Sequence, residues 1–211
     1  LRPEDYSDIG QAKGLAREYG CELRYSDATD FLRYDGMAWI EDRQLAVGAA
    51  EEFLDLQLLD AGEELEAAKG ALLDAGIPEI DVRAGGKQLE KSIGVGQGKA
   101  YFAFLAAKAY HAFVMKRRDW KYVVSALNAA KPMLAVSVSG LDKDAELLNT
   151  PEATYDLKEG MGGARPHDPA DLITKMTACS PGDKGRKLWA DSLELFFQGD
   201  RGLVDYVQQV V

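Results

Sequence analysis

A run of evenly phased apolar residues between Leu45 and about Leu73 constrains this chain more than any other feature. Its members recur every three or four residues: Val47, Ala50, Leu54, Leu58, Ala61, Leu65, Ala68 and Leu72. This spacing places them on one face of an α-helix. The pattern predicts a long helix, which Gly62 and Gly70 could divide into two. Residues 41–76 carry ten acids and two bases, which favours a solvated face.

The composition is that of a globular chain with an acidic surface. The 211 residues are 46% hydrophobic and 28% charged, with a net charge of −10, which fits one or two domains. The excess of acids argues against a surface built for non-specific duplex binding, so any contact with nucleic acid must be local. The longest apolar stretch, 100–107, is far too short to cross a bilayer, and the first residues are polar. The sequence predicts a cytoplasmic protein without membrane contact.

The two cysteines and the chain ends add two expectations. Cys21 and Cys179 lie far apart, without a CxxC motif or an adjacent histidine, so neither a disulfide framework nor a zinc site is indicated. The chain begins at Leu1 and stops at Val211 within an apolar pattern. We therefore expect a piece of a longer protein.

Shorter patterns outline the rest of the first two lobes. Residues 6–19 favour a helix that Gly20 ends, and 100–130 favour a helical region followed by an extended stretch from Pro132. The pair Asp35-Gly36 predicts a two-residue hairpin turn that sets Leu32 opposite Trp39. One apolar stripe is expected at Phe113, Trp120, Val124 and Leu127.

The last third of the chain alternates strands and helices. Strands are expected near 147–150, 154–157 and 164–166, then a mobile loop at 180–183 and a helix after it. A further helix begins after Gly199-Asp200. The predicted fold class is α+β, mostly helical with two small β-hairpins or a small antiparallel sheet. We expect a single domain over 1–211, with possible lobes at 1–44, 45–146 and 147–211. The apolar face of the helix after 183 is formed by Leu188, Trp189, Leu193, Phe196 and Phe197.

A glycine-rich segment before residue 100 looks like a phosphate-binding loop but lacks its spacing. It reads Gly94-Val95-Gly96-Gln97-Gly98-Lys99. A Walker A loop needs four residues between its glycines and a hydroxyl residue after the lysine, and position 100 is alanine. The dinucleotide pattern fails because Lys99 occupies the place of the third glycine. We expect a connection between helices.

A basic cluster stands out against the acidic background. Residues 108–131 carry six cations and only one acid, Asp119. Cations three or four residues apart share a helical face and can follow a phosphate backbone. The alternative is that they pair with the acidic helix at 41–76 or are simply solvated. The candidate DNA-contacting residues are Lys116, Arg117, Arg118 and Lys121.

No self-contained catalytic site emerges from the residues. The chain has two histidines, which rules out a three-histidine metal site and makes a histidine-based triad strained. Asp168 and Asp171 could hold magnesium near Lys175, as in a small metal-dependent enzyme. They equally suit a helix N-cap and an acid in its first turn. We assign no catalytic and no metal-binding residue.

One longer run carries a family resemblance. Three segments, 147–151, 155–157 and 165–177, resemble the hallmark run of the domain that precedes the superfamily 3 helicase module in phage and plasmid primase-helicases, and in the poxvirus primase-helicase. Weaker matches lie upstream at Tyr34-Asp35-Gly36 and Trp39 and downstream at Trp189 and Gly199-Asp200. The chain ends before any Walker A loop, Walker B acid or arginine finger.

The resemblance implies an accessory domain of a replicative helicase that is not an enzyme by itself. ATP and Mg²⁺ would belong to the helicase module outside this chain, and the partners would be that module, DNA, and further copies in a homo-hexamer. The context would be DNA replication in a bacterial host, encoded by a phage or prophage. A pure oligomerisation scaffold without DNA contact is the alternative. The residues expected at the junction with the motor are Asn149, Asp156, Arg165, His167, Asp168, Asp171, Thr174 and Lys175.

Overall fold

The predicted long helix exists, and it is continuous. The computed structural model describes residues 1–182 and 184–210, and its longest element is α2, Arg43–Asp74. Asp42 caps this helix by accepting hydrogen bonds from the backbone N–H groups of Gln44 and Leu45. The expectation that Gly62 or Gly70 divides the helix is wrong. Both glycines lie within one uninterrupted helix, where packing against α5 outweighs the roughly 1 kcal/mol that each costs.

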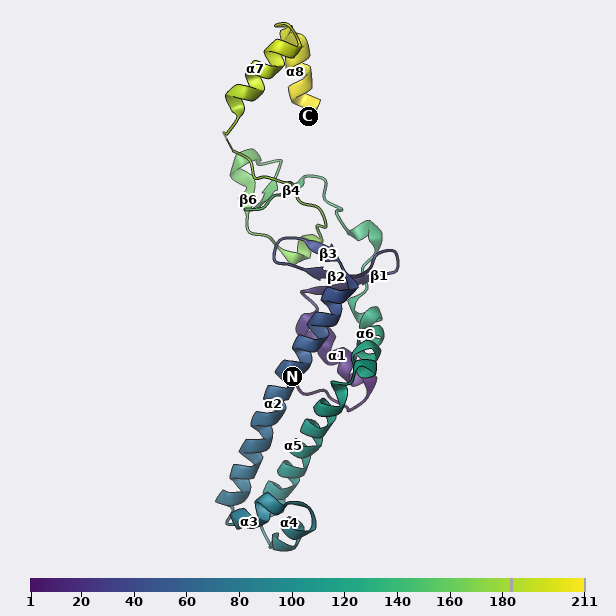
Figure 1. The fold of residues 1–211 in the computed structure, drawn as a ribbon, viewed down its shortest axis with the longest axis vertical. Helices are drawn as coiled ribbons and strands as arrows, with labels where there is room; N and C mark the ends of the chain where they lie inside the picture. Colours follow the sequence, from purple (N-terminus) through teal and green to yellow (C-terminus); the bar gives the residue numbers. More distant parts are fainter. Residues whose placement is uncertain (183, 211) are drawn as a thin grey trace.

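Helices α2 and α5 form an antiparallel arm that extends from the rest of the molecule (Figure 1). Helix α5 spans Gly98–Arg117, and two short helices, α3 (Glu79–Ala84) and α4 (Gly86–Ser92), close the far end. The glycine-rich segment lies at this end and connects helices, as predicted, with the Gln97 side chain donating to the Ala75 carbonyl. The apolar cluster there contains Ala68, Leu72, Ile77, Val82, Leu89, Phe104 and Ala107.

The body of the molecule packs α1 and α6 against the near end of α2. Helix α1 is Asp8–Tyr19 and α6 is Trp120–Leu134. The helical region predicted over 100–130 is confirmed as two helices that meet at Arg118 and Asp119. The prediction that Pro132 starts an extended stretch is wrong, because this residue lies inside α6. Because the break reorients α6, Trp120 leaves the expected stripe and is 60% exposed. The core contains Leu15, Leu23, Phe31, Ala46, Phe53, Val123, Leu127 and Leu134.

A three-stranded antiparallel sheet lies on this body. Its strands are β1 (Leu23–Ser26), β2 (Asp30–Tyr34) and β3 (Trp39–Glu41), in that order. The hairpin exists, but its expected register is wrong: Leu32 pairs with Glu41. The Asp35 carboxylate accepts hydrogen bonds from the N–H groups of Met37 and Ala38, both at 2.8 Å. This side-chain turn lengthens the loop beyond the two residues that Asp35-Gly36 alone would need.

A second sheet and a helical hairpin continue along the long axis of the molecule. The sheet has strands β4 (Leu147–Asn149), β5 (Thr154–Asp156) and β6 (Ala164–Arg165). Helices α7 (Arg186–Phe196) and α8 (Arg201–Val210) form the hairpin. Asp183 of the expected loop and Val211 lie outside the described residues. Short 3₁₀ turns span Val138–Gly140, Gly160–Gly163 and Pro169–Asp171.

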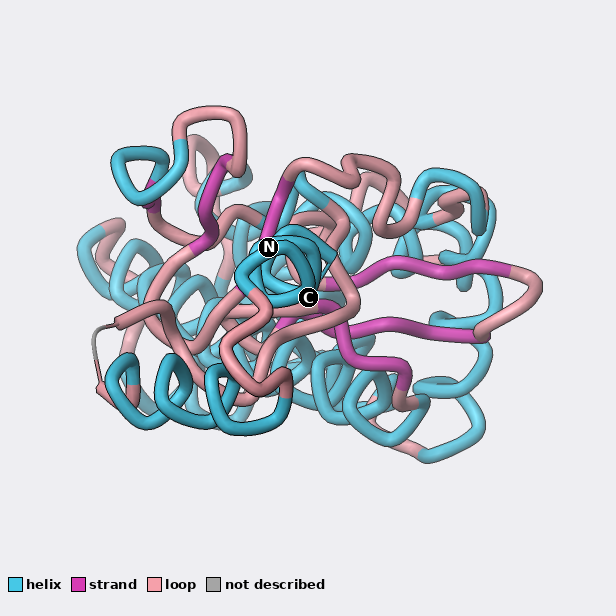
Figure 2. The backbone as a smooth tube through the Cα atoms, turned by 90° about the horizontal axis from the view of Figure 1, so that it is seen from above, coloured by secondary structure: helices cyan, strands magenta, loops and turns pink. Residues whose placement is uncertain are grey.

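The predicted fold class is confirmed, because the structure is mostly helical with two small antiparallel sheets. Seen down the long axis, one group of strands lies to the right of the view and the other to the upper left, and both overlap with helices (Figure 2). None of the helices in the described ranges combines the length and the apolar character that a membrane span needs. Cys21 and Cys179 are free and exposed.

Candidate functional site

Arg117 is an internal residue. Its guanidinium pairs with the Asp8 carboxylate and lies 4.7 Å from the ring centroid of Phe113 and 4.9 Å from that of Tyr122. Because this cation is buried and neutralised, it is withdrawn from the candidate DNA contacts. Hydrogen bonds from Ser125 and Arg117 lower the pKa of Asp8 below its usual value. The pair therefore fixes the corner at which α5 meets α6.

The other three candidates are on the surface at this corner. The Nζ atoms of Lys116 and Lys121 lie 5.5 and 4.8 Å from the Tyr122 ring centroid, within cation–π range. Neither lysine forms an ion pair with an acid in the described part of the chain. Arg118 pairs with Asp55 of α2, which is the alternative that the sequence left open. The free cations here are thus two lysines.

Sequence reasoning missed Trp120, which is the most exposed aromatic ring of this corner. It begins α6 between Arg118 and Lys121. A planar, exposed indole beside cations has the chemistry to stack a nucleic-acid base while the cations meet phosphates. The signal in the sequence was the Arg118-Asp119 pair, where a polar break separates Trp120 from the apolar period of the preceding helix. We call Lys116, Arg118, Trp120 and Lys121 the corner patch.

The hallmark run forms a hydrogen-bonded joint between the two sheets. The buried Asn149 donates from Nδ2 to the Met37 carbonyl at 2.9 Å. Its Oδ1 accepts from the Thr154 hydroxyl at 3.0 Å and lies 2.9 Å from His167 Nδ1. Trp39 completes the joint from the first sheet, with its indole Nε1–H donating to the Pro169 carbonyl at 2.9 Å. Asn149 therefore links the loop of one sheet to strands of the other.

The other residues of the run also make contacts within the domain, and Asp168 and Lys175 do so from exposed positions. Arg165 pairs with Asp171 at 2.7 Å, which raises the pKa of Arg165 above its usual value. Asp168 caps the 3₁₀ turn by accepting from Ala170 N–H at 2.8 Å. The Thr174 hydroxyl donates to Asp142 Oδ2 at 2.6 Å.

Asp156 and Lys175 are the last two residues of the set that we expected at the junction with the motor. Asp156 accepts from Lys158 N–H at 2.9 Å, and Lys175 approaches Asp142 to 3.8 Å.

These contacts bear on the metal hypothesis. The carboxylates of Asp168 and Asp171 serve a cap and an ion pair with Arg165, as the helix-start interpretation predicts. Across residues 1–182 and 184–210, no group of three His, Cys, Asp or Glu side chains could hold a metal ion.

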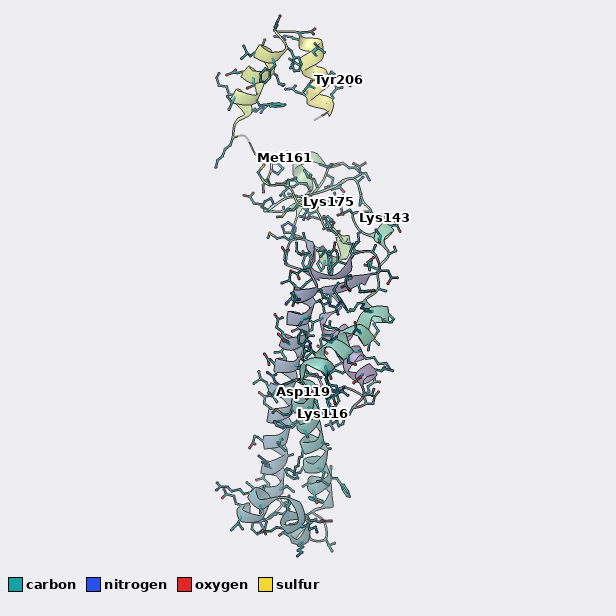
Figure 3. All side chains as sticks on the ribbon, turned by 45° about the vertical axis from the view of Figure 1, so that its right-hand side comes forward. Lys116, Asp119, Lys143, Met161, Lys175 and Tyr206 are labelled. Carbon is teal, nitrogen blue, oxygen red and sulfur yellow. The ribbon has the colours of Figure 1, made fainter. Side chains whose placement is uncertain are left out.

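The structure keeps the corner patch and the joint apart. Lys116 and Asp119 lie in the lower half of the molecule as drawn, whereas Lys175 lies well above them, near the second sheet (Figure 3). The two sets of predicted residues therefore do not form one site. The joint organises the domain, and the corner patch is an exposed polar surface on its body.

A comparison with family models decides the relationship. The model described as "D5 N terminal like" matches residues 12–198. The chain belongs to this family. It is the domain found N-terminal to superfamily 3 helicases in primase-helicases, and by itself it is a non-catalytic part of such proteins. The predicted resemblance is confirmed. The match to the D5 N-terminal-like family covers the body, the arm, both sheets and α7. No curated protein and no solved structure matches the chain.

Proposed function

We propose that this domain is an accessory module of a phage-type primase-helicase that packs against the helicase motor through α7 and α8. The observation that carries the proposal is the uncovered apolar face of this hairpin. Leu188 is 72% exposed and Phe196 is 74% exposed, and among the hairpin side chains that the structure describes only Leu193 is buried. Large apolar side chains exposed together on one helical hairpin mark an interaction site. ATP and Mg²⁺ belong, in this proposal, to the motor.

Family membership supports the motor as the occupant of that face. In D5 N-terminal-like proteins the helicase follows this domain, and α7 and α8 are the last helices of the described chain. A motor packed here would bury the apolar side chains that the body leaves exposed. The domain would then hold motor subunits in register in a ring such as a homo-hexamer.

Amide hydrogen exchange tests the proposal directly. In a primase-helicase that contains this domain, the amides of α7 and α8 are expected to exchange more slowly than in the isolated domain. The double variant Leu188→Ser/Phe196→Ser should lose that protection and reduce ATP hydrolysis by the ring. Glu194→Ser is the matched control, because Glu194 is exposed on the polar face of the same helix. Equal exchange in the isolated domain and the parent protein contradicts the proposal.

A second proposed role is DNA guidance by the corner patch. The observation that favours it is the exposed indole of Trp120 among Lys116, Arg118 and Lys121. Single-stranded nucleic acid would place phosphates on the lysines and stack a base on the indole. The overall acidity of the chain confines such binding to this patch.

Titration of labelled single-stranded DNA tests this role. Lys116→Ala/Lys121→Ala should weaken binding and lower the salt slope by about 1 per lost phosphate contact, and Trp120→Ala should weaken binding with little change in slope. Lys143→Ala/Lys158→Ala removes two equally exposed charges elsewhere and is the control. Equal binding by all variants, or none by the wild type, removes DNA from this corner and leaves a pure oligomerisation scaffold.

A further inference from the structure

The arm presents an unpartnered apolar face on α5. Phe102, which is 71% exposed, Leu105, Ala109 and Ala112 follow one another at steps of three or four residues on the side of α5 that points away from α2. This outer face spans about 15 Å of helix. The whole of α5 contains no acidic residue, and the exposed Lys108 and Lys116 flank the stripe.

Helix α2 presents an acidic outer side, in contrast to the basic outer side of α5. Its apolar residues there are Leu56 and Leu59, the latter 67% exposed, and they precede the small residues Ala67 and Gly70. Open space surrounds Gly70, since nothing lies within 4 Å of where its side chain would begin. Acids border this face, and they include Glu51, Asp55, Glu63, Glu66 and Asp74.

Contacts within the arm fix which residues share a height along it. Arg118 pairs with Asp55, and the Tyr110 hydroxyl donates to Asp60 at 2.9 Å. Further out, Phe104 clusters with Ala68 and Leu72. Residues of α5 near 105 therefore lie level with residues near 67 of α2, and those near 112 lie level with those near 60.

At matched heights the two outer faces are complementary in size and in charge. The bulky Phe102 and Leu105 lie level with the small Ala67 and Gly70. Conversely, the small Ala109 and Ala112 lie level with the segment of α2 that follows the bulky Leu59. Between them, Lys108 lies level with Glu63 and Glu64, and of these only Glu64 has an ion-pair partner among the described residues, Arg2.

We propose that a second copy of this chain docks on the arm, with the outer face of α5 in one copy packed antiparallel against the outer face of α2 in the next. Large side chains then fill the space over small ones, as in ridges-into-grooves helix packing. The lysines of α5 meet the acids of α2, which favours this pairing over α5 on α5 or α2 on α2.

The contact is heterologous, because it joins two different faces of the arm. Each copy therefore keeps one free face, and repeated contacts close into a ring or continue as a filament. The contact itself is argued from the two faces of the arm. Only the choice of a ring over a filament rests on the proposed accessory role beside a helicase motor. In Figure 1 the outer sides of both arm helices are free of other described elements between the body and the far end, where α3 and α4 lie.

Sedimentation velocity of the 211-residue chain over a range of concentrations tests the contact. The wild type is expected to shift to larger species as concentration rises. Phe102→Glu, which alters the α5 face, and Leu59→Glu, which alters the α2 face, should each be monomeric. Lys108→Glu, a fully solvated change, should raise the dissociation constant without affecting folding. Met161→Glu is the control, because Met161 is an equally exposed apolar residue away from the arm (Figure 3).

The decisive sample is the equimolar mixture of Phe102→Glu and Leu59→Glu. The first variant retains an intact α2 face and the second an intact α5 face, so they should form dimers and nothing larger. A wild type that stays monomeric at every concentration, or a mixture that stays monomeric while the wild type associates, overturns the inference. Failure here leaves the exchange protection of α7 and α8 unchanged, so the two proposals fail separately.

Discussion

The two small sheets have the same order of three antiparallel strands but are held in place by different forces. The first sheet buries Leu23 and Phe31 in the apolar cluster that the helices form, and it also buries Leu32 and Trp39, whose indole meets Pro169. Between Leu134 and Leu193, the described residues contribute no buried hydrophobic side chain. The second sheet instead buries Asn149 and Thr154 and holds them by hydrogen bonds.

This difference means that the first sheet contributes mainly to the stability of the fold, whereas the contacts of the second sheet mainly fix its orientation. Apolar burial is non-directional and supplies most of the free energy of folding, so the first sheet belongs to the cooperative core. Hydrogen bonds contribute less but fix angles and distances, so the second sheet is set in a defined position on the first. The part of the chain nearest the proposed motor contact is therefore positioned by polar contacts. Three substitutions test this difference, and a fourth tests a charged pair within the body.

Phe31→Ala should have the largest effect. Removing a buried aromatic side chain from the first sheet is expected to lower the free energy of unfolding by about 3–5 kcal/mol, measured by urea denaturation. The control is Ile40→Ala in the neighbouring strand, where the side chain is partly exposed and the loss should be at most about 1 kcal/mol. Equal losses for the two variants would contradict the assignment of Phe31 to the core.

Asn149→Ala should act on the second sheet alone. Its loss leaves the Met37 carbonyl without the Asn149 amide donor and the Thr154 hydroxyl with only its contact to His167, at a cost of about 2 kcal/mol. The amides of 147–156 should exchange faster, while those of β1 to β3 keep their protection. Asn128→Ala, at an exposed position, is the control. A uniform fall in protection across both sheets would show that they unfold as one unit.

Asp8→Asn tests a charged pair within the apolar body. The lowered pKa of Asp8 means that the folded state favours the ionised carboxylate. This stabilisation is present above the ordinary value of 3.8 and is lost as the pH falls through the lowered pKa. At neutral pH the variant should lose about 1 kcal/mol, because Asp8 is partly exposed and the amide oxygen remains an acceptor. Its stability should also vary less between neutral and acidic pH, and an unchanged acid dependence would contradict the pairing.

Thr174→Val should have the smallest effect. It removes the hydroxyl that donates to Asp142, a single bond in the polar joint, and should cost about 0.5 kcal/mol. Thr174→Ser keeps the hydroxyl and is the control. The expected signature is faster amide exchange confined to residues near 142 and 174, and an effect as large as that of Phe31→Ala would remove the distinction between the sheets.

Much of the fold could be predicted because its signals are local. The phased apolar residues of α2, the cap at Asp168 and the strands around Asn149 all follow from patterns within a few turns or strands of chain. The predicted register of the first hairpin was wrong because hydrogen bonds to the Asp35 side chain, and not Gly36 alone, determine the length of the loop. The prediction of a stripe through Trp120 was wrong because one polar pair, Arg118-Asp119, interrupts the helical period.

The sequence by itself determined where helices and strands form, since propensity, phasing and capping act between residues close in the chain. Only the tertiary structure decided which cation of the basic cluster is internal. Arg117 is buried because Asp8, from a helix far earlier in the chain, neutralises it between two rings. It also decided which apolar faces stay uncovered, on the arm and on α7, because burial depends on neighbours that no local pattern specifies.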